Sequence, residues 1–223
     1  MSSGTTTREL EELRQEMVQE QIHDRGVQNR RVLDALRSVP RHLFVPEDLM
    51  AEAYDDKPLP IGDGQTISQP FMVAAMTAAL ALEGGERVLE VGTGCGYQAA
   101  VLALLAREVH SVECVATLAA AAEARLARMG YPNVQVHHGD GTLGWEKDAP
   151  YDAIVVTAAA PQVPPPLVEQ LAKGGRLVIP VGRATEQELL LVQKLEGRTT
   201  AKTLHFCRFV PLLGRFGWPG SHF

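Results

Sequence analysis

The chain has 223 residues, of which 45% are hydrophobic and 22% charged, and this ordinary globular composition excludes a disordered, collagen-like or coiled-coil protein. The formal net charge is −6 and no basic run occurs, so nucleic acid is not expected as a substrate. No apolar stretch approaches the roughly 18 residues of a membrane span, and no secretory signal is visible. The three cysteines are widely spaced and odd in number, which favours a reducing compartment. We therefore expect one cytoplasmic domain spanning residues 1–223, without membrane contact.

Residues 1–82 are predicted to form an N-terminal helical lobe that carries an active-site loop. A capping-box pattern that begins at Thr6 predicts a first helix ending near Gly26. Asn29 is the expected N-cap of a second helix, and Pro46 begins a short third one. The start and stop signals are local, so they predict helices without saying how these pack.

Residues 57–70 contain three prolines and two glycines, and residues 71–82 then resume a helical pattern. The proline-rich segment is too long for a simple connection in a compact domain. Long ordered loops often carry function, so this segment is a candidate part of an active site.

From residue 87 onward, short apolar runs alternate with helical patterns. Strands are expected at 88–91, 109–112, 134–138, 151–157 and 176–181, followed by two more at 188–195 and 202–210. Alternation of strands and helices indicates a doubly wound, mainly parallel sheet with right-handed crossovers. No helix separates the last two strands, so they are expected to form an antiparallel hairpin. The fold class is thus α/β, with a seven-stranded Rossmann-like sheet in residues 83–213 and a tail at 214–223.

A glycine-rich loop follows the first predicted strand. The third glycine, Gly96, lies four residues after Gly92 (96 − 92 = 4), whereas the dinucleotide fingerprint GxGxxG requires five. The dinucleotide pattern is therefore not met. A plain tight turn between strand and helix remains an alternative, because a lone glycine-rich turn is weakly specific.

Two acidic residues at the ends of successive strands strengthen the case for a ligand. Glu113 lies 21 residues beyond Gly92 (113 − 92 = 21), where a carboxylate can accept both ribose hydroxyls of a nucleoside. Asp140 ends the next strand and could accept the adenine amino group. Either acid alone is explained by a solvated strand end, but together they predict a nucleoside cofactor. No GxxxxGK[ST] loop supplies a phosphate site, so S-adenosylmethionine is the obvious candidate.

The sequence resembles the protein-L-isoaspartate (D-aspartate) O-methyltransferase family over roughly residues 17–211. The blocks that carry this resemblance are QTISQP at 65–70, VLEVGTGCG at 88–96, Glu113, GDG at 139–141, YDAIVVTAAAP at 151–161, GGRLVIPVG at 174–182 and RFVPL at 208–212. Several independent blocks in the same order are far more specific than the glycine loop alone. The resemblance implies a methyltransferase sheet and a repair enzyme.

Such enzymes transfer a methyl group from S-adenosylmethionine to the α-carboxylate of L-isoaspartyl residues in damaged proteins and peptides. The ester then collapses to a succinimide, which hydrolyses partly to normal aspartate. The resemblance implies Ser68 as the catalytic residue, which from spacing alone would be a turn or helix-cap serine. The cofactor-binding residues that it implies are Gln65, Thr66, Ile67, Glu90, Gly92, Thr93, Gly94, Gly96, Glu113, Cys114, Asp140 and Gly141. The substrate-binding residues are Ser68, Ala158, Ala159, Ala160, Pro161 and Val210.

Two other functions remain open from the residues. One is a methyltransferase of the same fold that acts on a small molecule or another acceptor, and the other is a non-catalytic domain that only binds the cofactor. The neighbouring His137 and His138 point to opposite sides of a strand, so they are not expected to share a ligand. No HExxH or Cys/His zinc spacing occurs, so no metal is expected. The expected partners are isoaspartyl proteins and peptides, and the expected state is a monomer.

Overall fold

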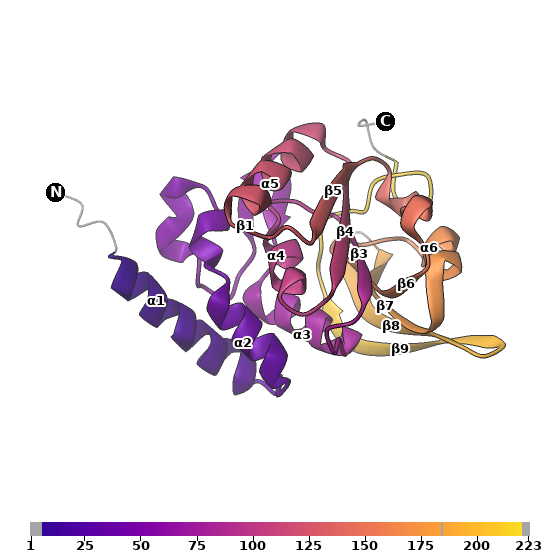
Figure 1. Cartoon of the computed structure of the whole chain (residues 1–223), viewed down its shortest axis with the longest axis horizontal. Coiled ribbons are helices and arrows are strands. Elements are labelled where there is room, and N and C mark those ends of the chain that lie inside the picture. Colours follow the sequence, from indigo (N-terminus) through magenta and orange to yellow (C-terminus); the bar gives the residue numbers. More distant parts are fainter. Residues whose placement is uncertain (1–5, 184, 220–223) are drawn as a thin grey trace.

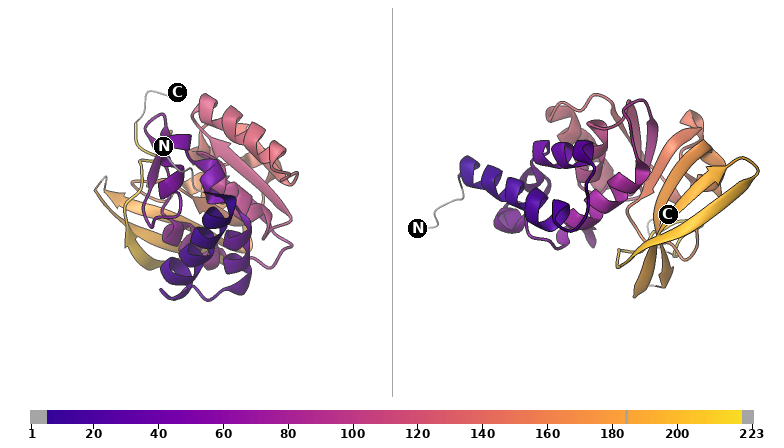
Figure 2. Two further views of the ribbon diagram at one scale, coloured as in Figure 1. Left: turned by 90° about the vertical axis from the view of Figure 1, so that its left-hand side faces the viewer. Right: turned by 90° about the horizontal axis from the view of Figure 1, so that it is seen from below.

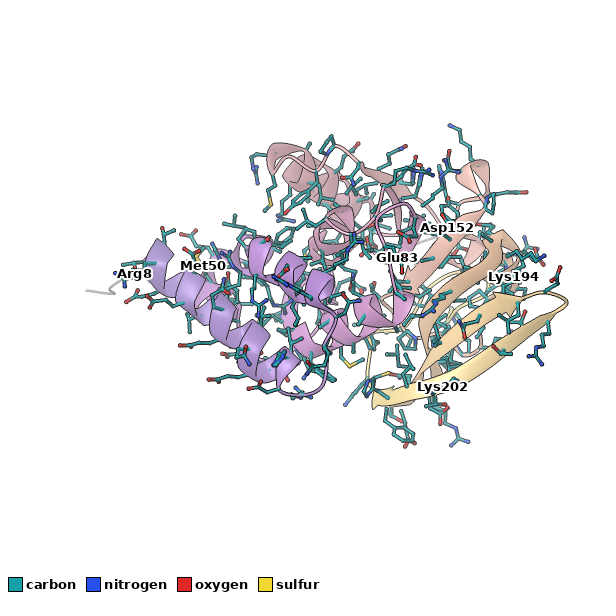
Figure 3. The ribbon with its side chains drawn as sticks, turned by 60° about the horizontal axis from the view of Figure 1, so that its bottom comes forward. Arg8, Met50, Glu83, Asp152, Lys194 and Lys202 are labelled. Carbon is teal, nitrogen blue, oxygen red and sulfur yellow. The ribbon has the colours of Figure 1, made fainter. Side chains whose placement is uncertain are left out.

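A computed structural model describes residues 6–183 and 185–219. The chain forms an N-terminal helical lobe beside a sheet that has helices on both faces (Figure 1). The first five residues of the predicted lobe and the last four of the predicted tail lie outside the described residues. Figure 3 shows Arg8 and Met50 on the lobe, with Lys194 and Lys202 on the strands at the opposite end of the molecule.

The first helices of the lobe begin where the sequence predicts. The predicted capping box is present, since Glu9 N donates to Thr6 Oγ1 over 3.3 Å and Thr6 N donates to the Glu9 carboxylate over 2.7 Å. Asn29 caps the second helix by accepting from Val32 N over 3.3 Å. The helical segments of the lobe are α1 (Thr7–Glu16), the π-helix η1 (Met17–His23), α2 (Arg30–Ser38) and the 3-10 turns η2 (Arg41–Phe44) and η3 (Glu47–Glu52).

The proline-rich segment is more regular than a loop. It contains two short antiparallel strands, β1 (Leu59–Gly62) and β2 (Gln65–Ile67). Gly62, Asp63 and Gly64 all have positive φ, which lets the chain reverse in a tight turn. Pro60 in β1 fits because a two-stranded sheet leaves edges that need no N–H donor.

The seven-stranded sheet confirms the predicted fold class. Its order is β5-β4-β3-β6-β7-β8-β9, with parallel pairing from β5 to β7 and antiparallel pairing of β8 with β7 and of β9 with β8. The strands are β3 (Arg87–Val91), β4 (Glu108–Glu113), β5 (Val134–His138), β6 (Tyr151–Val156), β7 (Leu171–Arg183), β8 (Glu186–Leu195) and β9 (Arg198–Cys207). Because β4 and β6 flank β3 on opposite sides, the chain connections diverge at the carboxyl end of β3. Doubly wound sheets bind ligands at such a point.

Helices cover both faces of this sheet, as the two views in Figure 2 show. One core holds α3, α4, the lobe and one face of the sheet, and α5 packs against β4 and β5. A second core lies on the other face, beneath α6. The remaining helical elements are α3 (Pro70–Leu80), α4 (Tyr97–Ala103), α5 (Ala116–Arg128), α6 (Pro165–Gln170) and the 3-10 turns η4 (Gly141–Leu143) and η5 (Glu146–Asp148).

Helix α3 joins the lobe to the sheet. It contacts η1 and α2 on one side and β6 and β7 on the other, so almost all of its residues are buried. Pro70 stands in its first turn, where a missing N–H costs nothing. Although α3 is apolar, no helix among the described residues combines the length and hydropathy of a membrane span.

Candidate active site

The glycine loop lies between β3 and α4. Gly92, Gly94 and Gly96 all have positive φ, a conformation that L side chains rarely adopt. A Cβ atom at Gly92 would lie 2.4 Å from the Thr157 hydroxyl oxygen, and one at Gly96 would lie 3.2 Å from a Leu126 methyl group. The loop therefore needs glycine both for its turn and for close packing. Gly96 lies against Leu126 and Ala122 of α5.

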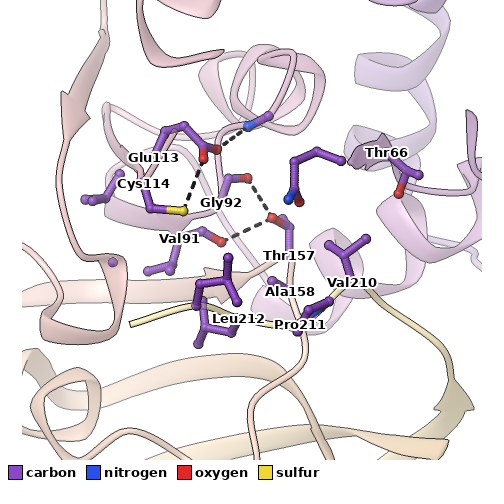
Figure 4. A pocket seen from close by; sticks show the side chains of 15 residues that line it. Thr66, Val91, Gly92, Glu113, Cys114, Thr157, Ala158, Val210, Pro211 and Leu212 are labelled. Atoms are coloured by element: carbon purple, nitrogen blue, oxygen red, sulfur yellow. Dashed lines mark hydrogen bonds between the residues drawn. The ribbon is translucent and has the colours of Figure 1, made fainter. Parts of the chain in front are cut away.

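A cavity of about 530 Å³ opens beside this loop, at the carboxyl ends of β3, β4 and β6 (Figure 4). We call it the loop cavity. Its lining residues are Gln65, Thr66, Val91, Gly92, Gly94, Val112, Glu113, Cys114, Gly141, Thr157, Ala158, Val210, Pro211, Leu212 and Leu213. Most of the residues implied for cofactor binding thus come together from four separate parts of the chain.

Glu113 lies in the loop cavity, and backbone donors hold its carboxylate in place. One oxygen accepts from Gly94 N over 2.8 Å, and the other accepts from Val115 N over 3.0 Å. The residue is only 5% exposed. A carboxylate has lone pairs left after two such bonds, so Glu113 can accept further hydrogen bonds from a ligand.

Asp140 is placed differently. One carboxylate oxygen accepts from Thr142 N over 2.9 Å and from the Thr142 hydroxyl over 2.6 Å, and the other accepts from Arg215 N over 2.8 Å. Asp140 lines a neighbouring cavity that includes Trp145, whereas the adjacent Gly141 lines the loop cavity. The side chain thus fixes the C-terminal segment against η4.

Glu90 lies buried on β3 and lines none of the described cavities. Its side chain is hydrogen-bonded to the Ser111 hydroxyl through one oxygen, while the other oxygen has no partner. The pKa of this carboxyl is raised to about 8, mainly by burial and to a smaller extent by the negative charge of Glu113, against the lowering effect of the Ser111 hydrogen bond. At neutral pH the group is therefore largely protonated.

A second, larger depression of about 1150 Å³ adjoins the loop cavity, and we call it the outer groove. It is lined by Pro58, Thr66, Ser68, Gln69, Met72, Phe206, Cys207, Arg208, Phe209, Val210 and Pro211. Thr66, Val210 and Pro211 line both spaces. Ser68 is half-buried and also lines a small pocket with Gly92 and Thr157. Ser68 thus lies between the outer groove and the glycine loop.

The other implied residues divide into two groups. Ile67 and Thr93 line the small pocket beside the loop. Ala159 and Ala160 are buried, and their backbone N–H groups already donate, to Val210 O over 2.8 Å and to Pro180 O over 3.0 Å. Pro161 is exposed and lines neither the loop cavity nor the outer groove. Of the 158–161 segment, only Ala158 therefore reaches the loop cavity.

Sequence reasoning missed several residues of the loop cavity. Thr157 follows β6 directly, and its hydroxyl donates to Gly92 O over 2.6 Å. The strand-end argument that selected Glu113 and Asp140 could have found Thr157, because β6 ends at the same edge. Val91, the last residue of β3, and Val112, next to the end of β4, supply apolar side chains at the same edge of the sheet. Pro211 and Leu212 belong to the RFVPL block, but no local signal places them or Leu213 at the cavity. They reach it only through the return of the chain after β9.

The chemistry of the loop cavity fits a nucleoside that carries positive charge and no phosphate. None of its described lining residues is Lys, Arg or His, so nothing there neutralises a pyrophosphate. The Glu113 carboxylate and the polar side chains of Gln65, Thr66 and Thr157 line the space instead. These are the donor and acceptor types that S-adenosylmethionine requires, and with the sheet they define a Rossmann-like methyltransferase.

Comparison with known proteins identifies the family. The family model for protein-L-isoaspartate(D-aspartate) O-methyltransferase matches residues 12–217. Among curated relatives, the protein-L-isoaspartate O-methyltransferase of Methanoculleus marisnigri is 56% identical over 208 residues, covering 93% of this chain and 94% of that one. The corresponding Geobacter metallireducens protein is 55% identical over 206 residues, covering 92% and 95%. The chain belongs to this family, as the sequence resemblance indicates.

Solved structures agree in fold. A protein-L-isoaspartate O-methyltransferase superposes with a TM-score of 0.83 at 30% identity, covering 92% of this chain and 67% of that one. A Plasmodium falciparum structure described as a protein-L-isoaspartate O-methyltransferase in complex with S-adenosyl-L-homocysteine gives a TM-score of 0.78 at 25% identity. It covers 90% of this chain and 98% of that one. The Rossmann-like methyltransferase fold is confirmed.

The Glu113→Ala variant is expected to bind S-adenosylmethionine at least about tenfold more weakly than the wild type. Loss of a charged acceptor typically costs about 1.5–3 kcal/mol. Titration calorimetry measures the affinity, and thermal melting checks the fold, because Glu113 also holds Gly94 N. Glu123→Ala, an exposed glutamate of α5, is the matched control. Unchanged affinity in folded Glu113→Ala would remove this carboxylate from the cofactor site.

Proposed function

We propose that this chain methylates the free α-carboxylate of L-isoaspartyl residues in peptides and damaged proteins, with S-adenosylmethionine in the loop cavity and the peptide in the outer groove. The ester product enters repair to aspartate through a succinimide. The observation that supports this assignment most is the junction of the two spaces. They share Thr66, Val210 and Pro211, and Ser68 lies beside that shared wall.

The loop cavity holds the cofactor through groups that need little rearrangement. Glu113 is already fixed by Gly94 N and Val115 N, so its free lone pairs are preorganised to accept from ribose hydroxyls. Val91, Val112 and Leu212 supply an apolar surface for the base. When bound, S-adenosylmethionine supplies a methyl group on positively charged sulfur, which is an activated leaving group.

The acceptor needs no general base, because a carboxylate with an ordinary pKa is already ionised at pH 7. The task of the chain is therefore to align the carboxylate and to exclude water. We propose that the Ser68 hydroxyl donates a hydrogen bond to one acceptor oxygen and so orients the other. Val210 and Pro211 form the apolar wall between the two spaces, which limits the entry of water.

The proposal also covers the partners of the chain, its location and its oligomeric state. The net charge of −6 and the absence of basic side chains in the described lining of the loop cavity favour peptides over nucleic acid. All three cysteines are free, in keeping with a reducing cytoplasm. The loop cavity and the outer groove are built from one copy of the chain, so we propose that the monomer is active.

Methyl transfer to a defined peptide tests the function. The purified chain is incubated with methyl-labelled S-adenosylmethionine and a peptide that contains a single L-isoaspartyl residue. The expected product is a labelled ester that releases methanol in mild base. Label that is stable to base would favour a methyltransferase with another acceptor. Tight cofactor binding without any transfer would favour a domain that only binds the cofactor.

The Ser68→Ala variant is expected to fold and to bind S-adenosylmethionine normally, but to lose a factor of roughly ten to a hundred in kcat. If the hydroxyl only orients the acceptor, its removal costs one hydrogen bond to a charged group, on the order of 1.5–3 kcal/mol. Steady-state rates at saturating isoaspartyl peptide measure the loss. Ser68→Thr keeps a hydroxyl and should recover part of the rate. Full activity of Ser68→Ala would exclude the orienting role, and a methylated serine in the wild type would exclude direct transfer.

A further inference from the structure

Two histidines and an aspartate converge on the edge of the sheet, away from the loop cavity. His110 of β4 and His137 of β5 project from the same face, and Asp148 of η5 reaches them from above the strands. The His110 Nδ1 atom lies 3.1 Å from His137 Nε2 and 3.6 Å from Asp148 Oδ2. All three ligand atoms lie within 4.8 Å of one another. Sequence spacing does not show this cluster, because its members are 27 and 11 residues apart (137 − 110 and 148 − 137).

These separations suit a single metal ion. Zinc binds imidazole nitrogen and carboxylate oxygen at about 2.0–2.2 Å, so two ligands at a tetrahedral angle lie about 3.3 Å apart. The distances of 3.1 and 3.6 Å bracket that value. Two imidazoles and one carboxylate with an open fourth position form a ligand set that zinc and its neighbours accept in proteins. The His110 side chain is fully buried, whereas Asp148 is 31% exposed, so an ion can enter from the aspartate side.

A second layer of contacts orients the three ligands. The other ring nitrogen of His110, Nε2, lies 3.1 Å from Glu108 Oε1, and Arg87 Nε donates to the second oxygen of Glu108 over 2.9 Å. A carboxylate at Nε2 holds the proton there and leaves the Nδ1 lone pair facing His137 and Asp148. Metal-binding histidines are oriented by such a carboxylate contact as a rule. These contacts therefore hold His110 in the orientation that metal binding requires.

Trp145 fixes the other two ligands. Its ring stacks on His137 at a centroid distance of 4.0 Å and an angle of 11°, and its Nε1 atom donates to Asp148 Oδ2 over 2.9 Å. The stacking holds the His137 ring, and the hydrogen bond holds the aspartate oxygen that faces His110. One residue thus restrains both partners, which lowers the entropy that metal binding must overcome.

We infer that His110, His137 and Asp148 form a binding site for one divalent transition-metal ion of the zinc type, completed by water at the fourth position. Without metal, one ring proton lies between His110 Nδ1 and His137 Nε2. Binding moves that proton to Nδ1 of His137, so both lone pairs face the ion and no net proton release is needed. The ion ties η5 to β4 and β5 and stabilises the folded chain. This site is separate from the proposed methyl-transfer site and does not depend on it.

Metal titration of the purified full-length chain, stripped with chelator, tests the inference. Zn²⁺ is expected to bind with a stoichiometry of one in calorimetry and to raise the melting temperature. Co²⁺ is expected to give the intense visible absorption of a low-coordinate site with nitrogen and oxygen ligands. It should also quench the fluorescence of Trp145, and the Trp145→Phe variant should lose that quenching. Absence of saturable one-to-one binding of either ion would overturn the inference.

Variants locate the ion. His137→Phe keeps an aromatic ring against Trp145 and is expected to weaken Zn²⁺ binding at least about a hundredfold, and Asp148→Asn provides a second ligand variant that keeps its size. Glu108→Gln changes only the outer layer and should weaken binding about 10–100-fold. His138→Ala is the matched control, since this exposed neighbour faces the other side of β5. Circular dichroism confirms folding. Wild-type affinity in both folded His137→Phe and Asp148→Asn would place the ion elsewhere and overturn the assignment.

Discussion

An L-isoaspartyl peptide is expected to be methylated at least about a hundredfold faster than the same peptide with a normal aspartyl residue. Isoaspartate inserts a methylene into the backbone and presents a free α-carboxylate, whereas aspartate presents a side-chain carboxylate in a different place. The acceptor carboxylate is already ionised, so acid–base catalysis cannot compensate for misplacement. A displacement of about 1 Å from the reactive geometry can cost about a hundredfold in rate.

Competing label incorporation into a matched peptide pair measures this ratio as kcat/KM. The two peptides differ only in the linkage at one residue, so charge and length are controlled. A third peptide with asparagine at that position, which lacks the carboxylate, sets the background. Comparable rates on the isoaspartyl and aspartyl peptides would make the chain a general carboxyl methyltransferase and would contradict the proposed alignment by Ser68 and the outer groove.

Glu90 is expected to make the free energy of unfolding fall as pH rises from about 4.5 to about 8. Burial raises the pKa of Glu90 to about 8 in the folded chain, against an ordinary value near 4.5. Between these values the folded state keeps a proton that the unfolded state has lost, so unfolding releases a proton and higher pH favours it. Each pKa unit corresponds to about 1.4 kcal/mol, so the full effect of this one group is roughly 3–5 kcal/mol.

The Glu90→Gln variant isolates this contribution, because glutamine fills the same space and cannot ionise. Urea unfolding of the wild type and the variant at pH 5 and pH 8.5 gives the difference in stability at each pH. We expect the variant to gain stability relative to the wild type as pH rises. Glu123→Gln, on the exposed face of α5, should show no such trend. A stability difference between wild type and Glu90→Gln that does not change with pH would show that the buried carboxyl is not protonated.

Much of the fold could be predicted because its signals are local. The capping box at Thr6 and the asparagine cap at Asn29 satisfy backbone donors within three residues, so they act wherever the segment lies. The alternation of strands and helices predicted the parallel sheet. The absence of a helix between the last two strands predicted the terminal hairpin. The hairpin of β1 and β2 was missed, because a proline such as Pro60 disfavours a strand in general and only its edge position accommodates it.

The site could be predicted in part. Glu113 and the glycine loop lie at the ends of parallel strands, and parallel strands bring their carboxyl ends to one edge of the sheet. The same argument placed Asp140 near this edge but could not give the direction of its side chain. The segment that ends in Arg215 returns over η4 and offers its N–H group to that carboxylate. Such a contact joins residues 75 positions apart, so no local pattern contains it.

By itself, the sequence determined the fold class, the family and the chemical type of the cofactor. These follow from periodicity, caps and ordered motifs, which depend on neighbours along the chain. Only the tertiary structure decided how the wall of Val210 and Pro211 joins the loop cavity to the outer groove, and how His110, His137 and Asp148 meet. Those arrangements depend on strand order, register and the return path of the chain. The physical reason is that hydrogen bonding and packing between distant segments select them, and the free energy of such contacts exists only once the sheet has formed.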